Sequence, residues 1–149
     1  MRTLIIGGPR CGKSTYAATL GVPHFCTDTI AQADTSIAPG ATYLPHELGP
    51  RDAWSMASAY IASTWFSLPD PWVIEGARTV HALRKWRTMR DEPVADEILL
   101  FHRALDTLTP GQASLSKSVW TIWNEISPLF TAIPTFDIEL DEDGTWLKL

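Results

Sequence analysis

The sequence predicts a three-layer α/β fold, in which helices flank a mainly parallel, five-stranded sheet with a C-terminal hairpin at its edge. Strand-like runs alternate with helix-like segments along the 149 residues, which fit one domain. The first run, residues 4–6, leads directly into a glycine-rich loop, residues 7–14, that matches G-x-x-x-x-G-K-[ST]. Together, these observations indicate a P-loop NTPase fold.

Strands are expected at five places along the chain. These are residues 3–7, 22–27, 71–75, 96–102 and 135–140. The runs at 72–74 and 98–101 are continuously apolar, as expected of strands that are buried on both faces. Residues 136–140 and 145–149, joined through Asp143 and Gly144, predict the C-terminal hairpin.

Helices are expected from about Gly12 and over residues 51–67, 79–90 and 110–127. The last is the clearest, because its apolar residues recur at helical spacing and Thr109-Pro110 supplies an N-cap followed by proline. Residues 29–49 contain two prolines and two glycines and show no sustained periodicity. Loops of that length are usually functional, so we expect this one to form a wall of an acceptor pocket.

Composition and charge argue against several classes of protein, including broad nucleic-acid binders, secreted proteins and membrane proteins. The net charge of −5 argues against broad nucleic-acid binding, although acidic residues concentrate near the C-terminus and leave room for a local basic patch. The N-terminal run is too short for a secretory signal and no apolar run could span a membrane, so we expect a cytoplasmic protein with no membrane partner. Cys11 and Cys26 fit two reduced, buried thiols. The oligomeric state is left open.

The glycine-rich loop predicts an ATP and Mg²⁺ site. Its glycines let successive backbone N–H groups point at an anion, Lys13 contacts the β- and γ-phosphates, and Ser14 offers its hydroxyl to Mg²⁺. The loop residues expected to bind the nucleotide are Gly7, Gly8, Pro9, Arg10, Cys11, Gly12, Lys13, Ser14 and Thr15. Arg10 either neutralises nucleotide charge or is a solvated side chain.

Residues that follow the other strands are the next candidates, because ligands of open α/β sheets lie beyond the carboxyl ends of the strands. Asp28 is a candidate general base, with a turn or N-cap aspartate as the alternative. Glu75 fits a carboxylate that holds Mg²⁺ or orients the acceptor, or one that pairs with Arg78. Arg78 is a candidate clamp for an acceptor phosphate. The predicted catalytic set is therefore Lys13, Asp28, Glu75 and Arg78, and either acid remains open as the base.

Two further groups are candidates for binding. Residues 103–117 form a lid-like segment in which Arg103 and Lys117 are the candidate cations, and Gln112 and Lys117 either face the nucleotide or are ordinary surface residues. The expected helix at 79–90 carries basic residues interleaved with an aromatic residue, which suits a DNA strand or an ordinary solvated face. The candidate DNA contacts are Arg84, Lys85, Trp86 and Arg87.

These residues resemble a known family. The loop and the run Val73-Ile74-Glu75-Gly76-Ala77-Arg78 are similar to segments of small P-loop kinases related to nucleoside monophosphate kinases, which have Asp where this chain has Glu75. Trp72-Val73-Ile74-Glu75-Gly76, Ala82-Leu83-Arg84-Lys85-Trp86 and Leu108-Thr109-Pro110-Gly111-Gln112, with Lys117, Trp120 or Trp123 and Glu125-Ile126, resemble bacteriophage 5-hydroxymethyl-deoxyuridine DNA kinases.

The resemblance implies ATP-dependent phosphorylation of the hydroxymethyl group of 5-hydroxymethyluracil in phage DNA, a step toward hypermodified thymidines in the host cytoplasm. Kinases of free deoxynucleotides or nucleosides are the alternative within the enzyme class. A nucleotide-binding switch is the alternative outside it, although none of the chain's four lysines lies in the N-K-x-D signature of GTPases.

Overall fold

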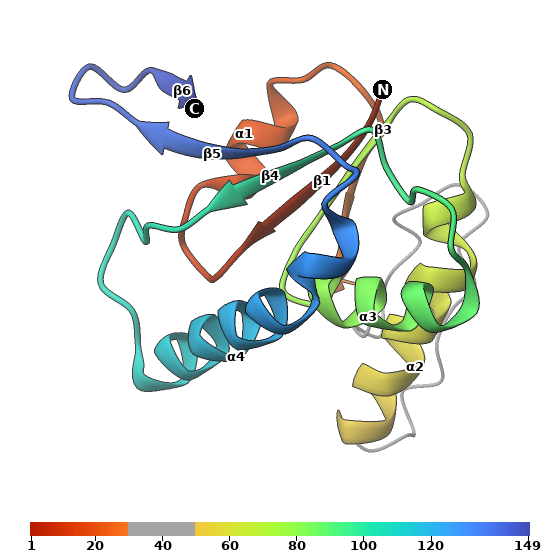
Figure 1. The fold of residues 1–149 in the computed structure, drawn as a ribbon. Coiled ribbons are helices and arrows are strands. Elements are labelled where there is room, and N and C mark those ends of the chain that lie inside the picture. The colour runs from red at the N-terminus through yellow and green to blue at the C-terminus, as the bar shows by residue number, and fades with distance from the viewer. Residues whose placement is uncertain (30–49) are drawn as a thin grey trace.

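Six strands form one sheet in the order β2-β3-β1-β4-β5-β6 (Figure 1). The computed structural model describes residues 1–29 and 50–149. The strands are β1 (Arg2–Gly7), β2 (His24–Cys26), β3 (Trp72–Glu75), β4 (Glu97–Phe101), β5 (Thr135–Leu140) and β6 (Trp146–Lys148). All neighbouring pairs are parallel except the last, in which β5 and β6 form the expected hairpin. The predicted parallel sheet is confirmed, and most of the expected loop at 29–49 lies outside the described residues.

The helices follow the predicted order. They are α1 (Lys13–Ala18), α2 (Pro50–Ser63), α3 (Thr79–Met89) and α4 (Pro110–Ile126), with short 3₁₀ turns η1 (Thr27–Thr29), η2 (Trp65–Ser67) and η3 (Ser127–Phe130). The helix expected at 51–67 ends early, because Thr64 leaves the helical conformation and η2 then buries Trp65 and Phe66. No helix among the described residues is both long and apolar enough to cross a membrane.

The start of α4 is built as its sequence predicts. Thr109 Oγ1 accepts a hydrogen bond from the Gln112 backbone N–H at 3.2 Å, and Gln112 Oε1 accepts one from the Thr109 N–H at 3.0 Å. This capping box satisfies two donors that a helix end would otherwise leave unpaired. Pro110 at the first helical position costs no hydrogen bond there.

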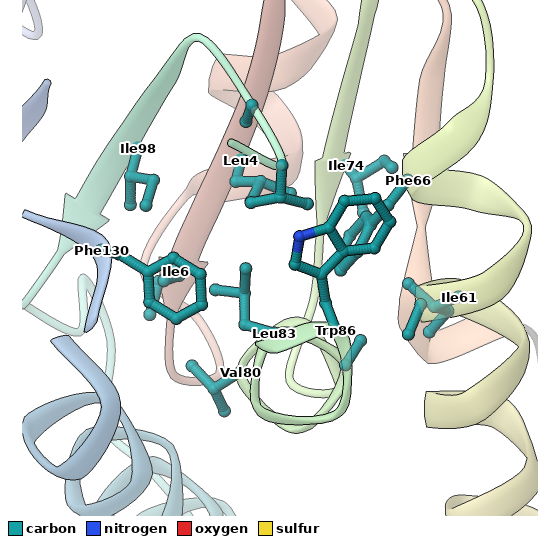
Figure 2. Packing of buried hydrophobic residues seen from close by; sticks show 14 of the residues in the cluster. Leu4, Ile6, Ile61, Phe66, Ile74, Val80, Leu83, Trp86, Ile98 and Phe130 are labelled. Atoms are coloured by element: carbon teal, nitrogen blue, oxygen red, sulfur yellow. The ribbon is translucent and has the colours of Figure 1, made fainter. Parts of the chain in front are cut away.

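Side chains of the central strands divide between two layers of helices. Leu4 and Ile6 of β1 pack in the larger apolar cluster with α2, α3 and α4, whereas Ile5 packs in the smaller cluster with α1 and the C-terminal hairpin. The division follows from the alternation of side chains along a strand. Figure 2 shows the larger cluster, with strand residues facing Val80, Leu83 and Trp86 of α3. The sheet is therefore covered on both faces.

We expect Ile74→Ala to destabilise the protein by about 2–5 kcal/mol, since it leaves a cavity in a packed core. Ile74 is 0 % exposed on β3 and lies opposite Leu4 on one side and Phe25 on the other. Denaturant unfolding measures the change in free energy. Met89→Ala, at a side chain that is 53 % exposed, is the control and is expected to cost no more than about 0.5 kcal/mol.

Candidate functional site

The loop between β1 and α1 is curled around the carbonyl oxygen of Gly8. That oxygen accepts hydrogen bonds from Lys13 Nζ at 2.9 Å and from Cys11 Sγ at 3.1 Å. Lys13 is only 7 % exposed, so its ammonium group is folded back over the loop. Arg10 and Gly12 both take left-handed conformations, with φ of 58° and 84°. The backbone therefore has the tight curvature that an anion-binding loop requires.

Two other parts of the chain lie against this loop. A Cβ atom on Gly8 would come within 2.8 Å of Ser116 Cβ on α4, and one on Gly12 would come within 2.6 Å of the Trp146 ring on β6. Both glycines therefore allow close packing. The N–H of Leu105 donates to the carbonyl oxygen of Arg10 at 2.8 Å, so the lid-like segment also contacts the loop.

A cavity of about 350 Å³ opens beside the loop. It is lined by residues 10–15 together with Leu105 and Asp106. Asp106 Oδ2 lies 2.5 Å from Arg10 Nη2, so the charge of Arg10 is paired with a carboxylate rather than simply solvated.

The predicted lid residues occupy three different surroundings. Arg103 lines a second cavity, of about 150 Å³, together with Cys11 and Trp146. Lys117 is exposed and directly follows Ser116, the residue of α4 that lies against Gly8. The Gln112 side-chain oxygen is engaged in the capping box. Contact of Gln112 and Lys117 with a nucleotide stays a prediction.

Glu75, at the end of β3, joins the loop to the sheet. Its Oε1 accepts a hydrogen bond from Ser14 Oγ at 2.7 Å and lies 3.0 Å from His24 Nε2. The residue is 0 % exposed, and Oε2 has no hydrogen-bond partner among residues 1–29 and 50–149. A buried carboxylate oxygen without a partner is costly, so this oxygen is suited to a ligand. Hydroxyl and carboxylate oxygens are the donors that Mg²⁺ prefers, and the pair Ser14–Glu75 fits the predicted metal site.

Asp28 and Arg78 meet where β2 and β3 end. Asp28 Oδ1 accepts a hydrogen bond from the Ala77 N–H at 2.9 Å and lies 3.9 Å from Arg78 Nη1. Arg78 is 7 % exposed and also donates through Nη1 to the Thr27 carbonyl oxygen at 3.3 Å. Burial lowers the pKa of Arg78 and the charge of Asp28 opposes that shift. The close approach requires Gly76, whose φ is 128° and whose added Cβ would lie 2.1 Å from Thr27 Oγ1.

Cys11 and Cys26 are not joined in a disulfide, and Cys26 is only partly buried. Burial, with the nearby charges of Glu75 and Asp28, raises the pKa of Cys26 to about 12. Because the thiolate is the reactive form, we expect Cys26 of the folded protein to react with iodoacetamide at pH 8 about 10³-fold more slowly than a free cysteine. Peptide mass spectrometry measures the rate, which should rise as the pH is raised and the thiol ionises. Rapid reaction in the folded state would contradict this, and the urea-unfolded protein is the control.

The predicted DNA-binding face of α3 needs one correction. Trp86 is 3 % exposed and lies in the core, where its ring packs edge-on against Phe66 at 5.9 Å (Figure 2). It is therefore unavailable for stacking on a base. The side chains of Arg84 and Arg87 are 46 % and 34 % exposed, and each pairs with an acidic side chain. Contact of Arg84, Lys85 and Arg87 with DNA stays a prediction.

The structure adds residues that the sequence did not indicate. His24 contacts Glu75, Ser116 covers Gly8, and Trp146 covers Gly12. One local signal could have indicated His24. It lies two residues before Cys26, the last residue of β2, and alternate residues of a strand share a face, so both side chains lie on the same side of the sheet. Ser116 and Trp146 had none, since they reach the loop from distant parts of the chain.

Comparisons with known proteins bear on the fold. Neither the models of protein families nor the curated proteins include a match to this sequence. Among solved structures, the chain is similar to a shikimate kinase from Acinetobacter baumannii in complex with shikimate, with a TM-score of 0.52 and 14 % identity. The match covers 95 % of this chain and 84 % of that one. The chain therefore has the α/β P-loop fold of a shikimate kinase, with its C-terminal hairpin at the sheet edge.

Proposed function

We propose that this protein is an ATP- and Mg²⁺-dependent phosphotransferase that phosphorylates a hydroxyl group. The observation that carries the proposal is the hydrogen bond between Ser14 and Glu75, which joins the loop to the carboxyl end of β3. It brings a hydroxyl and a carboxylate side by side, next to a loop whose lysine is folded inward. The fold shared with a shikimate kinase supports the same reaction class.

Each residue of the proposed site has its own role in the transfer of the phosphoryl group. Bound Mg²⁺, held through Ser14 and Glu75, would neutralise charge on the nucleotide phosphates. Lys13 stabilises the negative charge of the transferring phosphoryl group. Asp28 is the proposed general base: Oδ1 is held by the Ala77 N–H, which leaves Oδ2 to take the proton of the acceptor. The acceptor oxygen forms a bond to the γ-phosphorus as the bond to the bridging oxygen breaks, and ADP leaves with that electron pair.

The proposed acceptor is the hydroxymethyl group of 5-hydroxymethyluracil in DNA. Its support is the sequence resemblance to phage DNA kinases, together with two arginines on α3, Arg84, which is exposed, and Arg87, which is partly exposed. Arg78 is the candidate for orienting the acceptor, because its guanidinium lies beside Asp28. A free hydroxymethylated deoxynucleotide is the second candidate, since it offers the same alcohol.

The test offers ATP labelled in the γ-phosphate together with one acceptor at a time. The acceptors are DNA containing 5-hydroxymethyluracil, ordinary thymine DNA, the matching free mononucleotides, and shikimate, which the structural neighbour binds. We expect label only in the hydroxymethylated DNA. Label only in free nucleotides would replace the DNA acceptor with a nucleotide, and label only in shikimate would replace both. Slow hydrolysis that no acceptor accelerates would favour a nucleotide-binding switch.

A further inference from the structure

We infer that His24 is a positioning residue for Glu75: it holds one carboxylate oxygen so that the other stays available to the metal or to a metal-bound water. The inference rests on the proposed function, because it concerns the Mg²⁺ that this function requires. His24 touches neither nucleotide nor acceptor in this assignment. It acts through its contact with Glu75 Oε1, which is 3.0 Å from His24 Nε2.

Ser14 and His24 converge on one oxygen of Glu75. Ser14 Oγ donates to Oε1 at 2.7 Å and His24 Nε2 lies 3.0 Å from the same atom, whereas Oε2 has no partner among the described residues. Glu75 is 0 % exposed, so water does not offset the missing partner. Oε1 is therefore held by two protein groups, whereas Oε2 is the oxygen that we assign to the metal or to a metal-bound water.

His24 matters as a second donor to Glu75 because Ser14 is also expected to bind the metal. A hydroxyl has one proton and two lone pairs, so Ser14 can donate to Glu75 and still offer a lone pair to the metal. Any movement of Ser14 toward the metal weakens its hold on Oε1. His24 comes from a different strand and remains as the fixed donor, since an ionised carboxylate oxygen can only accept and Nε2–H therefore supplies the proton.

The sheet brings His24 into reach. In the parallel pairing of β2 with β3, Cys26 lies opposite Glu75 and His24 lies opposite Val73. The imidazole therefore approaches the carboxylate from two residue pairs further back along the strands. An aspartate at position 75 would have a side chain shorter by about 1.5 Å, one carbon–carbon bond, and would withdraw from this contact. The use of Glu rather than Asp at the end of β3 is thereby explained.

The test measures Mn²⁺ binding, as a probe for Mg²⁺, in the presence of a non-hydrolysable ATP analogue. Electron paramagnetic resonance reports free Mn²⁺ and needs no turnover. We expect His24→Ala to weaken Mn²⁺ binding about 10-fold, the effect typical of removing a residue that orients a metal ligand. Binding of the analogue without metal, measured in EDTA, should stay unchanged.

Two near-isosteric variants separate positioning from packing. His24→Gln places an amide N–H near the position of Nε2 and should restore Mn²⁺ binding, whereas His24→Asn is shorter and should bind about as weakly as His24→Ala. This pair also decides the matter if His24→Ala does not fold. The matched control is His102→Ala, which removes another histidine–carboxylate contact, to Asp137 at 2.8 Å, and should leave Mn²⁺ binding unchanged.

The outcomes separate this inference from the proposed function. Wild-type protein that binds no Mn²⁺ with the analogue would overturn both. Wild-type binding that His24→Ala leaves unchanged would overturn the positioning role alone. Equal weakening by His24→Gln and His24→Asn would show that the imidazole only fills space, and would also overturn it.

Discussion

Lys13→Ala is expected to lower phosphoryl transfer by about 10³-fold or more, the cost of removing a preorganised charge from the transferring group. Lys13 is 7 % exposed and its ammonium lies 2.9 Å from the Gly8 carbonyl oxygen, so its charge is held within the loop. Steady-state transfer to the acceptor, with melting temperature measured in parallel, tests the expectation.

Lys148→Ala is the matched control for this change. Lys148, on the hairpin strand β6, is an exposed lysine whose Nζ lies 2.7 Å from Glu97 Oε2, so the variant removes a lysine and its oxygen contact outside the loop. We expect its transfer rate to stay near that of the wild type. A Lys13→Ala protein that folds and retains normal transfer would remove the loop from its proposed role.

Asp28→Asn is expected to slow the chemical step by about 10²–10⁴-fold, the usual contribution of a general base, while ATP binding is spared. The substitution suits the geometry, because the Asn side-chain oxygen can still accept the hydrogen bond that Ala77 N–H donates to Asp28 Oδ1 at 2.9 Å. The turn is therefore kept and the proton acceptor is lost. Single-turnover transfer measures the rate, and titration with an ATP analogue measures binding.

Asp70→Asn makes the same chemical change two residues before β3 begins, at a side chain that is 54 % exposed, and should alter neither rate nor binding. Full activity of Asp28→Asn would exclude Asp28 as the base and leave Glu75 as the remaining candidate. Loss of ATP-analogue binding would instead assign Asp28 to the nucleotide side of the site.

Much of the fold could be predicted because its signals are local. The strands β3 and β4 are continuous apolar runs, and α4 begins at the cap and proline that its sequence shows. The end of α2 could not be predicted from local signals. Trp65 and Phe66 continue the apolar pattern of the helix, although the chain leaves the helix at Thr64. The helix ends there because both rings pack into the core.

The candidate site was predictable where one segment supplies both the residue and its place. The loop and the strand ends are of this kind, whereas the contact between His24 and Glu75 depends on the register of two strands. The burial of Trp86 could have been predicted from the sequence. Val80, Leu83 and Trp86 follow one another at intervals of three residues and therefore share one face of α3, which is the buried face. The basic residues around Trp86 lie on the rest of the helix.

The contacts of the two loop glycines also imply how related sequences should vary. A Cβ on Gly8 would lie 2.5 Å from Ser116 Oγ, 2.8 Å from its Cβ and 3.1 Å from its Cα, so an alanine at position 8 is expected to occur together with a glycine at position 116 and a small shift of α4. Gly12 has a φ of 84°, which restricts the position to glycine whatever stands opposite it. In an alignment of homologues, positions 8 and 116 should therefore covary, whereas position 12 should stay constant while position 146 changes independently.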